Sequence, residues 1–299
     1  MMLKNFGQME QFVREQSGKK RVALAAAHDA DALGSLMMAV DRGIAEAILI
    51  GRRKEIVRVL DEMGKDAGDF RIIEEADDRA AADKAVELVH CGEADMPMKG
   101  LMHTSTFMKA ILDKEKGLKE DGNLLSQASV FEIPEKDRFL IISDCAVNID
   151  PDLETKIKIT ENAAALAHTL GIEQPKIAVL SAVEVVNPKI RSTVDAAAMR
   201  ERLSDRYLID GPLALDNAID EAAAHHKGIE SPVAGNADIL IVPDLWSGNI
   251  FSKGLVFFAH LRSAGTLNGL KAPVVMSSRT DTVENKYLSI LTAVLQTIR

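Results

Sequence analysis

The chain is poor in aromatic residues and in cysteine. Aromatic side chains make up 4% of the 299 residues and hydrophobic residues 47%, so the cores must be built from aliphatic side chains. Cys91 and Cys145 are far apart and form no CxxC pattern, which argues against a disulfide scaffold or a zinc knuckle and fits a reducing cytosol. A Gly-x-Gly-x-x-Gly motif is also missing after the first expected strand, so a dinucleotide-binding site is not indicated.

Long apolar runs and an excess of positive charge are absent as well. No apolar stretch approaches the ~20 residues needed to cross a bilayer, and the N-terminal segment has no signal-peptide core. The net charge of −9 and the pI of about 5.4 argue against nucleic acid or an anionic membrane as a partner. We therefore expect a cytoplasmic protein that needs a local basic site to bind an anionic small molecule.

Short apolar runs alternate with segments of helical spacing. In the first part of the chain, helices are expected over 2–17, 53–63 and 78–90 and strands over Arg21–Ala27, Ala45–Gly51 and Phe70–Ile73. Such alternation implies right-handed βαβ crossovers and a mostly parallel sheet covered on both faces. The polar, glycine-containing segment 117–123 is the best candidate for a hinge between two domains.

The stretch from Pro273 to Asn285 is the first candidate anion site. An apolar run at Pro273–Met276, expected as a strand, ends in Ser277, Ser278 and Arg279. A helix is expected to follow, with Asp281 as N-cap and Glu284 completing a capping box. Hydroxyls, a guanidinium and free N–H groups at a helix start together suit an anion. The alternative is a capped terminal helix with an exposed arginine.

Two further strand ends carry polar side chains. An expected strand at Met98–Met102 leads into His103, Thr104 and Ser105, with a helix to Lys116 and Lys109 in its second turn; the alternative is a threonine N-cap with a solvated lysine. Open α/β sheets bind ligands at strand ends.

The other strand end follows Ile239–Val242. There, Gly248 leaves room for a close approach to the backbone, Asn249 offers a donor and an acceptor, and Lys253 lies about one helical turn further on.

A loop dense in carboxylates follows the expected strand Phe139–Ser143. It contains Asp144, Asp150 and Asp152, which raises the possibility of a hard cation. Because Pro151 and Asp152 suit the start of a helix over 152–170, a metal site is not expected there. Beyond this loop, the remaining expected elements are a strand at Lys176–Leu180, a helix at 191–203, a strand at Tyr207–Ile209 and a helix at 213–226.

The motifs SDCAVNIDPD, SPVAGNAD, PDLWSGNIFSK and VMSSRTD follow one another in the chain. In this order they resemble the phosphate acetyltransferase / phosphate butyryltransferase family, over nearly the whole chain and most strongly from Leu140 onward. The length and the terminal SRTD pattern favour the butyryltransferase branch. The resemblance implies two three-layer α/β domains with mostly parallel sheets around a central cleft, as in isocitrate and isopropylmalate dehydrogenases. The first domain would hold 1–123 and 266–299, because the last strand and helix return to it, and the second would hold 124–265.

The resemblance also implies the activity: acyl-CoA plus phosphate exchange with acyl phosphate plus CoA, by direct attack in a ternary complex. CoA would be a substrate, and no bound cofactor, metal or nicotinamide is implied; family members are commonly homodimers. Ser278 would hydrogen-bond the reacting oxygens and Arg279 would bind an anionic group. The other implied phosphate- or CoA-binding residues are His103, Thr104, Ser105, Lys109, Ser277, Asp144, Asn148, Asn249 and Lys253.

This sequence departs from the acetyltransferase pattern at two places. An aspartate proposed as the base of the acetyltransferases lies seven residues after the serine of Ser-Arg, where this chain has Asn285, which cannot act as a base near neutral pH. Glu284, Asp281 or no dedicated base remain as alternatives. An arginine after the histidine-hydroxyl motif is replaced by Lys109 with the spacing one shorter, and lysine lacks the bidentate fork of arginine.

Rival functions stay open from the sequence. The chain could be a phosphate acetyltransferase, or a CoA- or acyl-phosphate-binding protein without activity, as the loss of the aspartate at Asn285 suggests. A metal- and nicotinamide-dependent decarboxylating dehydrogenase of the related fold would need the aspartates of 144–152 to converge on a cation.

Overall fold

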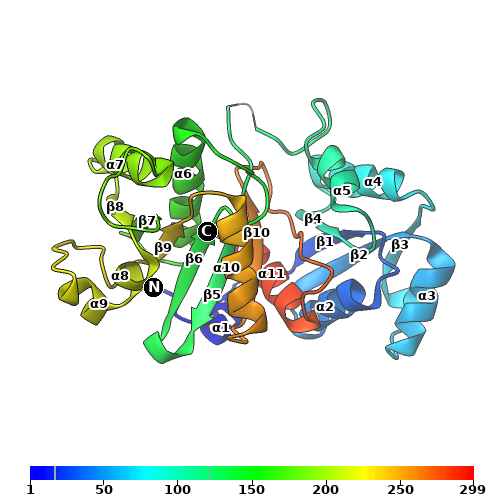
Figure 1. Cartoon of the computed structure of the whole chain (residues 1–299). Coiled ribbons are helices and arrows are strands. Elements are labelled where there is room, and N and C mark those ends of the chain that lie inside the picture. The colour runs from blue at the N-terminus through cyan, green and yellow to red at the C-terminus, as the bar shows by residue number, and fades with distance from the viewer. Residues whose placement is uncertain (17, 121) are drawn as a thin grey trace. The chain divides into compact units, whose positions relative to one another are not determined.

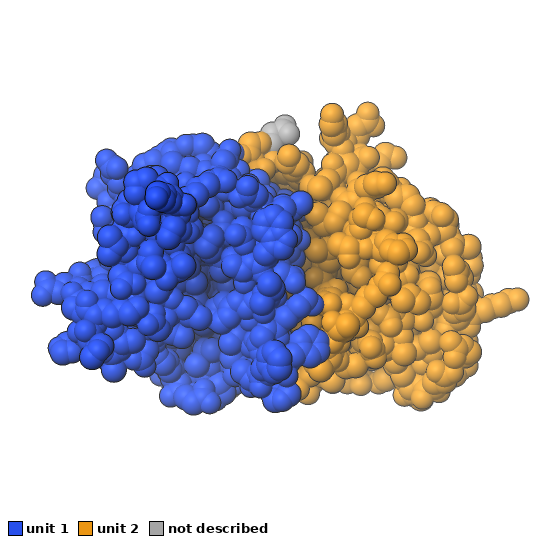
Figure 2. All heavy atoms as spheres, viewed as in Figure 1, with its two compact units in different colours: residues 1–5, 124–263 blue, residues 6–123, 264–299 orange. Residues whose placement is uncertain are grey.

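The computed structural model describes residues 1–16, 18–120 and 122–299. Its chain divides into two compact units, coloured separately in Figure 2. Unit 1 comprises Met1–Asn5 and Leu124–Ser263, and unit 2 comprises Phe6–Asn123 and Ala264–Arg299. The expected hinge 117–123 includes Asp121 and the expected first helix includes Ser17, and both of these residues lie outside the described ones.

Unit 2 is built on a four-stranded parallel sheet in the order β3-β2-β1-β4. The strands are β1 (Lys20–Ala25), β2 (Ala45–Gly51), β3 (Arg71–Glu74) and β4 (Met96–Lys99). The helices are α1 (Phe6–Glu15), α2 (Ala30–Asp41), α3 (Arg53–Glu62), α4 (Asp78–His90), α5 (Thr104–Ile111) and α11 (Val283–Gln296), with a 3-10 turn at Ala67–Asp69. Figure 1 shows α4 and α5 on one face of this sheet and α2 and α11 on the other. Burial is therefore continuous along β4 and the end of β1, as in other sheets covered on both sides.

Unit 1 contains the strands β5 (Ser126–Ile133), β6 (Arg138–Ser143), β9 (Ile239–Ile241), β7 (Lys176–Leu180) and β8 (Leu208–Leu213), in that spatial order. Only the β5–β6 hairpin among these pairs is antiparallel, and its turn is the 3-10 segment Pro134–Lys136. The helices are α6 (Leu153–Thr169), α7 (Arg191–Leu203), α8 (Leu215–Ile219), α9 (Glu221–His226) and α10 (Leu245–Phe257). The strand β10 (Ser263–Asn268) begins at the last residue of unit 1 and carries the chain into unit 2.

The predicted fold class, α/β with mostly parallel sheets, is confirmed, and several predicted boundaries are wrong. The strand predicted at Met98–Met102 is β4 and ends at Lys99, and the helix after it stops at Ile111 rather than Lys116. The strand predicted at Tyr207–Ile209 continues to Leu213. The helix predicted over 213–226 is two short helices, because the backbone is extended at Asp220.

Two segments near the C-terminus also differ from expectation. The strand β10, with the sequence SAGTLN, was not predicted, since only Ala264 and Leu267 in it are apolar. The apolar run at Pro273–Met276 forms only isolated bridges, from Val274 to Leu267 and from Val275 to Met98. Among the described residues, none of the helices has the length and hydropathy required to cross a membrane.

Candidate anion-binding site

The segment after Val275 forms a tight turn in unit 2. The backbone N–H of Ser278 donates to a carboxylate oxygen of Asp281 at 2.7 Å, and the N–H of Asp281 donates to the carbonyl of Ser278 at 3.2 Å. The hydroxyl of Ser278 lies 3.1 Å from that of Thr280. These bonds hold Ser278 and Arg279 at the exposed tip of the turn.

The start of α11 lies one residue later than the sequence predicted. Thr282 is the N-cap, and its hydroxyl accepts a hydrogen bond from the N–H of Asn285 at 3.1 Å. The predicted capping box of Asp281 and Glu284 is therefore wrong, because the Asp281 carboxylate binds the N–H of Ser278 instead. Glu284 lies exposed in the first turn of α11, and Asn285 is buried.

A buried lysine holds this turn by hydrogen bonds to its backbone carbonyls. Lys286 is 2% exposed, and its ammonium donates to the carbonyl of Asp281 and, at 3.4 Å, to that of Arg279. No sequence pattern singles out Lys286, because a lysine in a helix is usually solvated. Its contacts show that it fixes the backbone on both sides of Thr280.

The turn between β4 and α5 lies beside this segment. His103 is the N-cap of α5 without a side-chain capping bond, and Thr104 and Ser105 occupy the first turn, where the backbone N–H groups are not used by the helix itself. The alternative of a threonine N-cap is therefore wrong by one residue. The guanidinium of Arg279 donates to the carbonyl of Met102 at 3.3 Å, which joins the two segments.

These segments line an open pocket of about 480 Å³ within unit 2. Its lining residues are Lys99, His103, Thr104, Ser105, Ser277, Ser278 and Arg279. All of them except Lys99 are candidate site residues from the sequence, so the structure brings together the two unit 2 motifs. Arg279 and the first turn of α5 both favour a negative charge there.

Lys99 is the residue of this pocket that the sequence did not reveal. It ends β4 and is 5% exposed. Burial, and next the nearby positive charge of Arg279, lower the pKa of Lys99 from its ordinary value. The available signal was a lysine at the carboxyl end of an otherwise apolar strand.

Two other predicted residues of unit 2 lie outside the pocket lining. Lys109 is exposed in the second turn of α5, and Glu284 is exposed in the first turn of α11. Five residues along a helix correspond to a rotation of about 140°, so Lys109 projects from a different side of α5 than Thr104. The roles predicted for Lys109 and Glu284 toward the substrates stay predictions.

In unit 1, the Asp144 side chain organises the loop after β6. One of its carboxylate oxygens accepts hydrogen bonds from the N–H groups of Ala146 and Val147 at 2.8 and 3.0 Å. The other accepts from the side-chain amide of Asn148 at 2.6 Å, and that amide also donates to the carbonyl of Leu125 at 2.9 Å. Asp144 is 3% exposed, so its buried carboxylate stabilises the loop through these hydrogen bonds.

The first turn of α10 packs directly on this loop. A Cβ atom at Gly248 would lie 2.4 Å from the carbonyl oxygen of Asp144, so the close approach expected at this glycine is made by the protein's own backbone. The side-chain amide of Asn249 donates to the carbonyl of Cys145 at 3.1 Å, and Lys253 is exposed one turn further along α10. Binding of substrate by Asp144, Asn148, Asn249 or Lys253 stays a prediction.

Cys145 in this loop is unsuited to act as a nucleophile. Its thiol is buried, and burial raises its pKa to about 12. Because the thiolate is the reactive form, a thiol with such a pKa stays protonated and unreactive near neutral pH.

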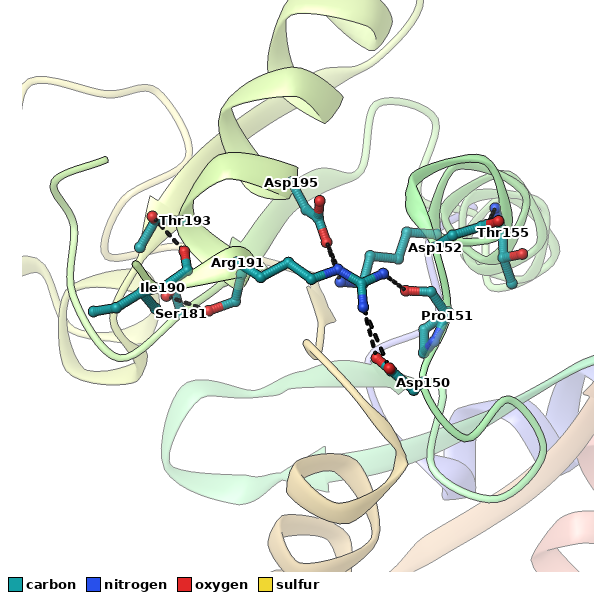
Figure 3. Close-up of polar contacts among 11 residues, drawn as sticks. Asp150, Pro151, Asp152, Thr155, Ser181, Ile190, Arg191, Thr193 and Asp195 are labelled. Atoms are coloured by element: carbon teal, nitrogen blue, oxygen red, sulfur yellow. Dashed lines mark hydrogen bonds and ion pairs between the residues drawn. The ribbon is translucent and has the colours of Figure 1, made fainter. Parts of the chain in front are cut away.

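The remaining aspartates of the loop have partners of their own (Figure 3). The guanidinium of Arg191 donates to Asp150 at 3.1 Å and to the carbonyl of Pro151 at 3.1 Å, and it also lies 3.4 Å from Asp195. Asp152 caps α6 by accepting from the N–H of Thr155 at 2.8 Å. These carboxylates thus attach the loop to α6 and α7. Within the described residues, no group of histidine, cysteine and carboxylate side chains is arranged to hold a metal ion.

Comparison with known proteins places this geometry in context. Residues 69–294 match the family model described as "Phosphate acetyl/butaryl transferase". A phosphate butyryltransferase of Clostridium acetobutylicum is 46% identical, with 98% of each chain covered. A phosphate acetyltransferase of Thermotoga maritima is 42% identical, covering 94% of this chain and 97% of the other.

A solved structure of a related enzyme has a similar fold. The crystal structure of a branched-chain phosphotransacylase from Enterococcus faecalis V583 matches with a TM-score of 0.83 at 35% identity, covering 93% of this chain and 98% of the other. The family resemblance predicted from the four motifs is confirmed. The chain belongs to the phosphate acetyl/butyryl transferase family and is an acyltransferase.

Proposed function

We propose that the protein exchanges an acyl group between CoA and inorganic phosphate, so that acyl-CoA and phosphate give acyl phosphate and CoA. The observation that carries this proposal is the pocket in unit 2, where Arg279 and the hydroxyls of Ser277 and Ser278 meet the first turn of α5. Positive charge, hydroxyl donors and a helix N-terminus are the groups that bind phosphate in proteins. Membership of an acyltransferase family supports the same chemistry.

The reaction is a direct transfer between two bound substrates. A phosphate oxygen attacks the thioester carbonyl carbon, the new C–O bond forms, the C–S bond breaks, and CoA leaves as a thiolate that takes up a proton. Holding two anions at one carbonyl supplies proximity, and positive groups stabilise the charge that develops on the carbonyl oxygen. We assign Arg279 to the anionic group and Ser278 to the reacting oxygens.

The acyl group that we propose is butyryl or another short or branched chain. Support comes from the Clostridium relative, which is named a phosphate butyryltransferase, and from the Enterococcus structure, which is titled a branched-chain phosphotransacylase. The acetyltransferase named in Thermotoga keeps acetyl as the second candidate. Because one methylene changes selectivity by only ~1–3 kcal/mol, several neighbouring acyl groups should be accepted.

A panel of acyl-CoA substrates tests this proposal. Acetyl-, butyryl-, isobutyryl- and valeryl-CoA are each incubated with phosphate, and free thiol is measured with and without a metal chelator. We expect the highest kcat/KM with a four- or five-carbon acyl group, and rates that the chelator leaves unchanged. A preference for acetyl-CoA would favour the second candidate. Binding of CoA without turnover of any acyl donor would refute the proposal.

In the reverse direction, where CoA attacks an acyl phosphate, the base that we propose to take the proton of the CoA thiol is Glu284. Its place in the first turn of α11, two residues after the Thr282 cap, puts it near the Ser278 turn in sequence, although it does not line the pocket. Replacing Glu284 with Gln should lower kcat for the reaction of CoA with an acyl phosphate about 100-fold, since general bases contribute about 10²–10⁴-fold. An unchanged kcat in this direction would show that Glu284 is not the base.

A further inference from the structure

The pocket contains a buried cation without a carboxylate partner. Lys99 is 5% exposed, and its ammonium has one hydrogen bond, a long one of 3.3 Å to the carbonyl of Gly100. Lys99 forms no ion pair with a carboxylate among the described residues, and the acidic groups that influence its pKa, Asp29 and Asp281, act only through their charge at longer range. Burying a charge in this way is unfavourable unless a ligand compensates it.

The backbone around Lys99 is fixed, so the side chain has a defined place. The backbone N–H of Lys99 donates to the carbonyl of Val275 at 3.0 Å, and the N–H of Gly100 donates to the carbonyl of Ala25 at 2.8 Å. A side chain at residue 100 is excluded, because a Cβ atom there would lie 2.3 Å from the carbonyl oxygen of Ala26. Lys99 is thus held at the end of β4, between β1 and the segment that leads to the Ser278 turn.

We propose that Lys99 is an anion-binding residue of this pocket and that its ammonium, together with Arg279, binds a phosphate-type anion. Both side chains line the same pocket, and their positive charges repel each other. A bound anion would compensate this repulsion, because it attracts both charges. The anion is either inorganic phosphate or a phosphate group of CoA. The proposal refines the proposed function, since it names a residue for the same site.

In this assignment Lys99, and not Lys109, supplies the second positive charge of the pocket. The sequence pointed to Lys109, at the place where acetyltransferases of the family carry an arginine. In the structure Lys109 is exposed and outside the pocket lining, whereas Lys99 is buried and part of it. A buried ammonium attracts an anion much more strongly than a solvated one, because the surrounding dielectric is lower.

Replacing Lys99 with Met tests this assignment. Methionine has a similar length and removes only the charge, and Lys54→Met, on the exposed surface of α3, is the matched control. For Lys99→Met we expect the KM of the anion that binds here to rise roughly 10- to 100-fold, the range for a lost hydrogen bond to a charged group. Lys54→Met should leave the KM for phosphate and the KM for acyl-CoA unchanged, and Lys109→Met should raise the affected KM less than Lys99→Met does.

The two possible anions are separated by two KM values and one binding measurement. A raised KM for phosphate with an unchanged KM for acyl-CoA identifies inorganic phosphate, and the reverse result identifies a phosphate group of CoA. Calorimetric titrations with phosphate alone and with CoA alone repeat the comparison without turnover. If the wild type binds these anions but shows no acyl transfer, the proposed function fails while the role of Lys99 is still tested.

Stability and pH separate a binding role from a structural one. Since Lys99→Met removes an uncompensated buried charge, its melting temperature should equal or exceed that of the wild type, and Lys99→Gln serves as a second variant. The pKa of Lys99 is lowered, so anion binding by the wild type should weaken as the pH rises through this pKa. The groups that set this pKa, Arg279, Asp29, Lys286 and Asp281, remain in Lys99→Met, which should lack this alkaline loss. A folded Lys99→Met protein with wild-type KM and binding constants for both anions would overturn the proposal.

Discussion

Arg279 is positioned by contacts that leave the residue exposed. Its carbonyl accepts a hydrogen bond from the ammonium of Lys286, and its guanidinium donates one hydrogen bond, to the carbonyl of Met102. A guanidinium has five N–H donors, so the remaining ones are available to an anion. The backbone of Arg279 is therefore fixed by the fold, while its charge is left for a ligand.

Replacing Arg279 with Ala should lower kcat/KM for acyl transfer about 100-fold or more, because a charge-assisted hydrogen bond to the reacting anions is lost. Arg279→Lys should recover only part of this loss, since lysine cannot form a bidentate pair. The measurement is free-thiol release from acyl-CoA with phosphate. Arg58→Ala, an exposed arginine on α3 that pairs with Glu62, is the control for the loss of one positive charge. Normal turnover by Arg279→Ala would remove Arg279 from the site.

The residues that the sequence revealed and those that it missed differ in their chemistry. Ser278, Arg279 and His103 carry polar groups in a motif at a predicted strand end, and the structure places them around one pocket. Lys99 and Lys286 are instead single lysines within largely apolar segments, and they are 5% and 2% exposed. Lysine is rarely buried, so a sequence pattern treats it as a surface residue, and only the packing shows otherwise.

At the scale of single elements, the existence and type of a helix or strand were predicted better than the residue at which it begins or ends. The strand β2 and the helix α4 have the predicted bounds, because apolar runs and helical spacing define them locally. The start of α11 was misplaced by one residue, since Asp281 and Thr282 are both good N-caps. The choice between them depends on the N–H of Ser278, which binds the Asp281 carboxylate through a turn that the pattern does not encode.

The packing of α10 on the Asp144 loop gives a prediction for this element. Gly248→Ala places a methyl group 2.4 Å from the Asp144 carbonyl oxygen and 2.8 Å from Val242, so α10 or the loop must move. We expect the free energy of unfolding to fall by about 1–3 kcal/mol, as for other overpacked sites. Urea denaturation followed by circular dichroism measures the change.

Gly254 in the same helix is the matched control. A Cβ atom at Gly254 would meet no other atom within 4 Å, and alanine favours a helix over glycine by about 1 kcal/mol. Gly254→Ala should therefore be neutral or stabilising. If both variants gain stability, the contact between Gly248 and Asp144 does not restrict α10.

At the scale of the whole molecule, α10 leaves large apolar side chains exposed. Trp246, Ile250, Phe257 and Phe258 are 59%, 71%, 52% and 90% exposed. Apolar side chains gathered on one helix are typical of surfaces that bind another protein. We expect a homodimer, as the family resemblance implies, and this stays a prediction.

Sedimentation velocity at micromolar concentration tests this expectation. The wild type should sediment at about twice the mass of the 32.5 kDa chain. Phe258→Glu should shift the distribution toward monomer if α10 contributes to the contact, because a buried unpaired charge at an interface is unfavourable. Val185→Glu, at another exposed apolar side chain, is the comparison. A wild type that sediments as a monomer would contradict the expectation.

Unit 2 is assembled from two pieces of chain that are separated by nearly all of unit 1. The helix α11 is buried over most of its length and packs against α1 and α2. During synthesis on the ribosome, the sheet of unit 2 emerges first, but its core cannot be completed until residues 264–299 have been made. Almost all residues of unit 1 are available before that point. The unit that carries the Ser278 turn and the β4–α5 turn is completed last, so a nascent chain that ends before Ser277 lacks one side of the pocket.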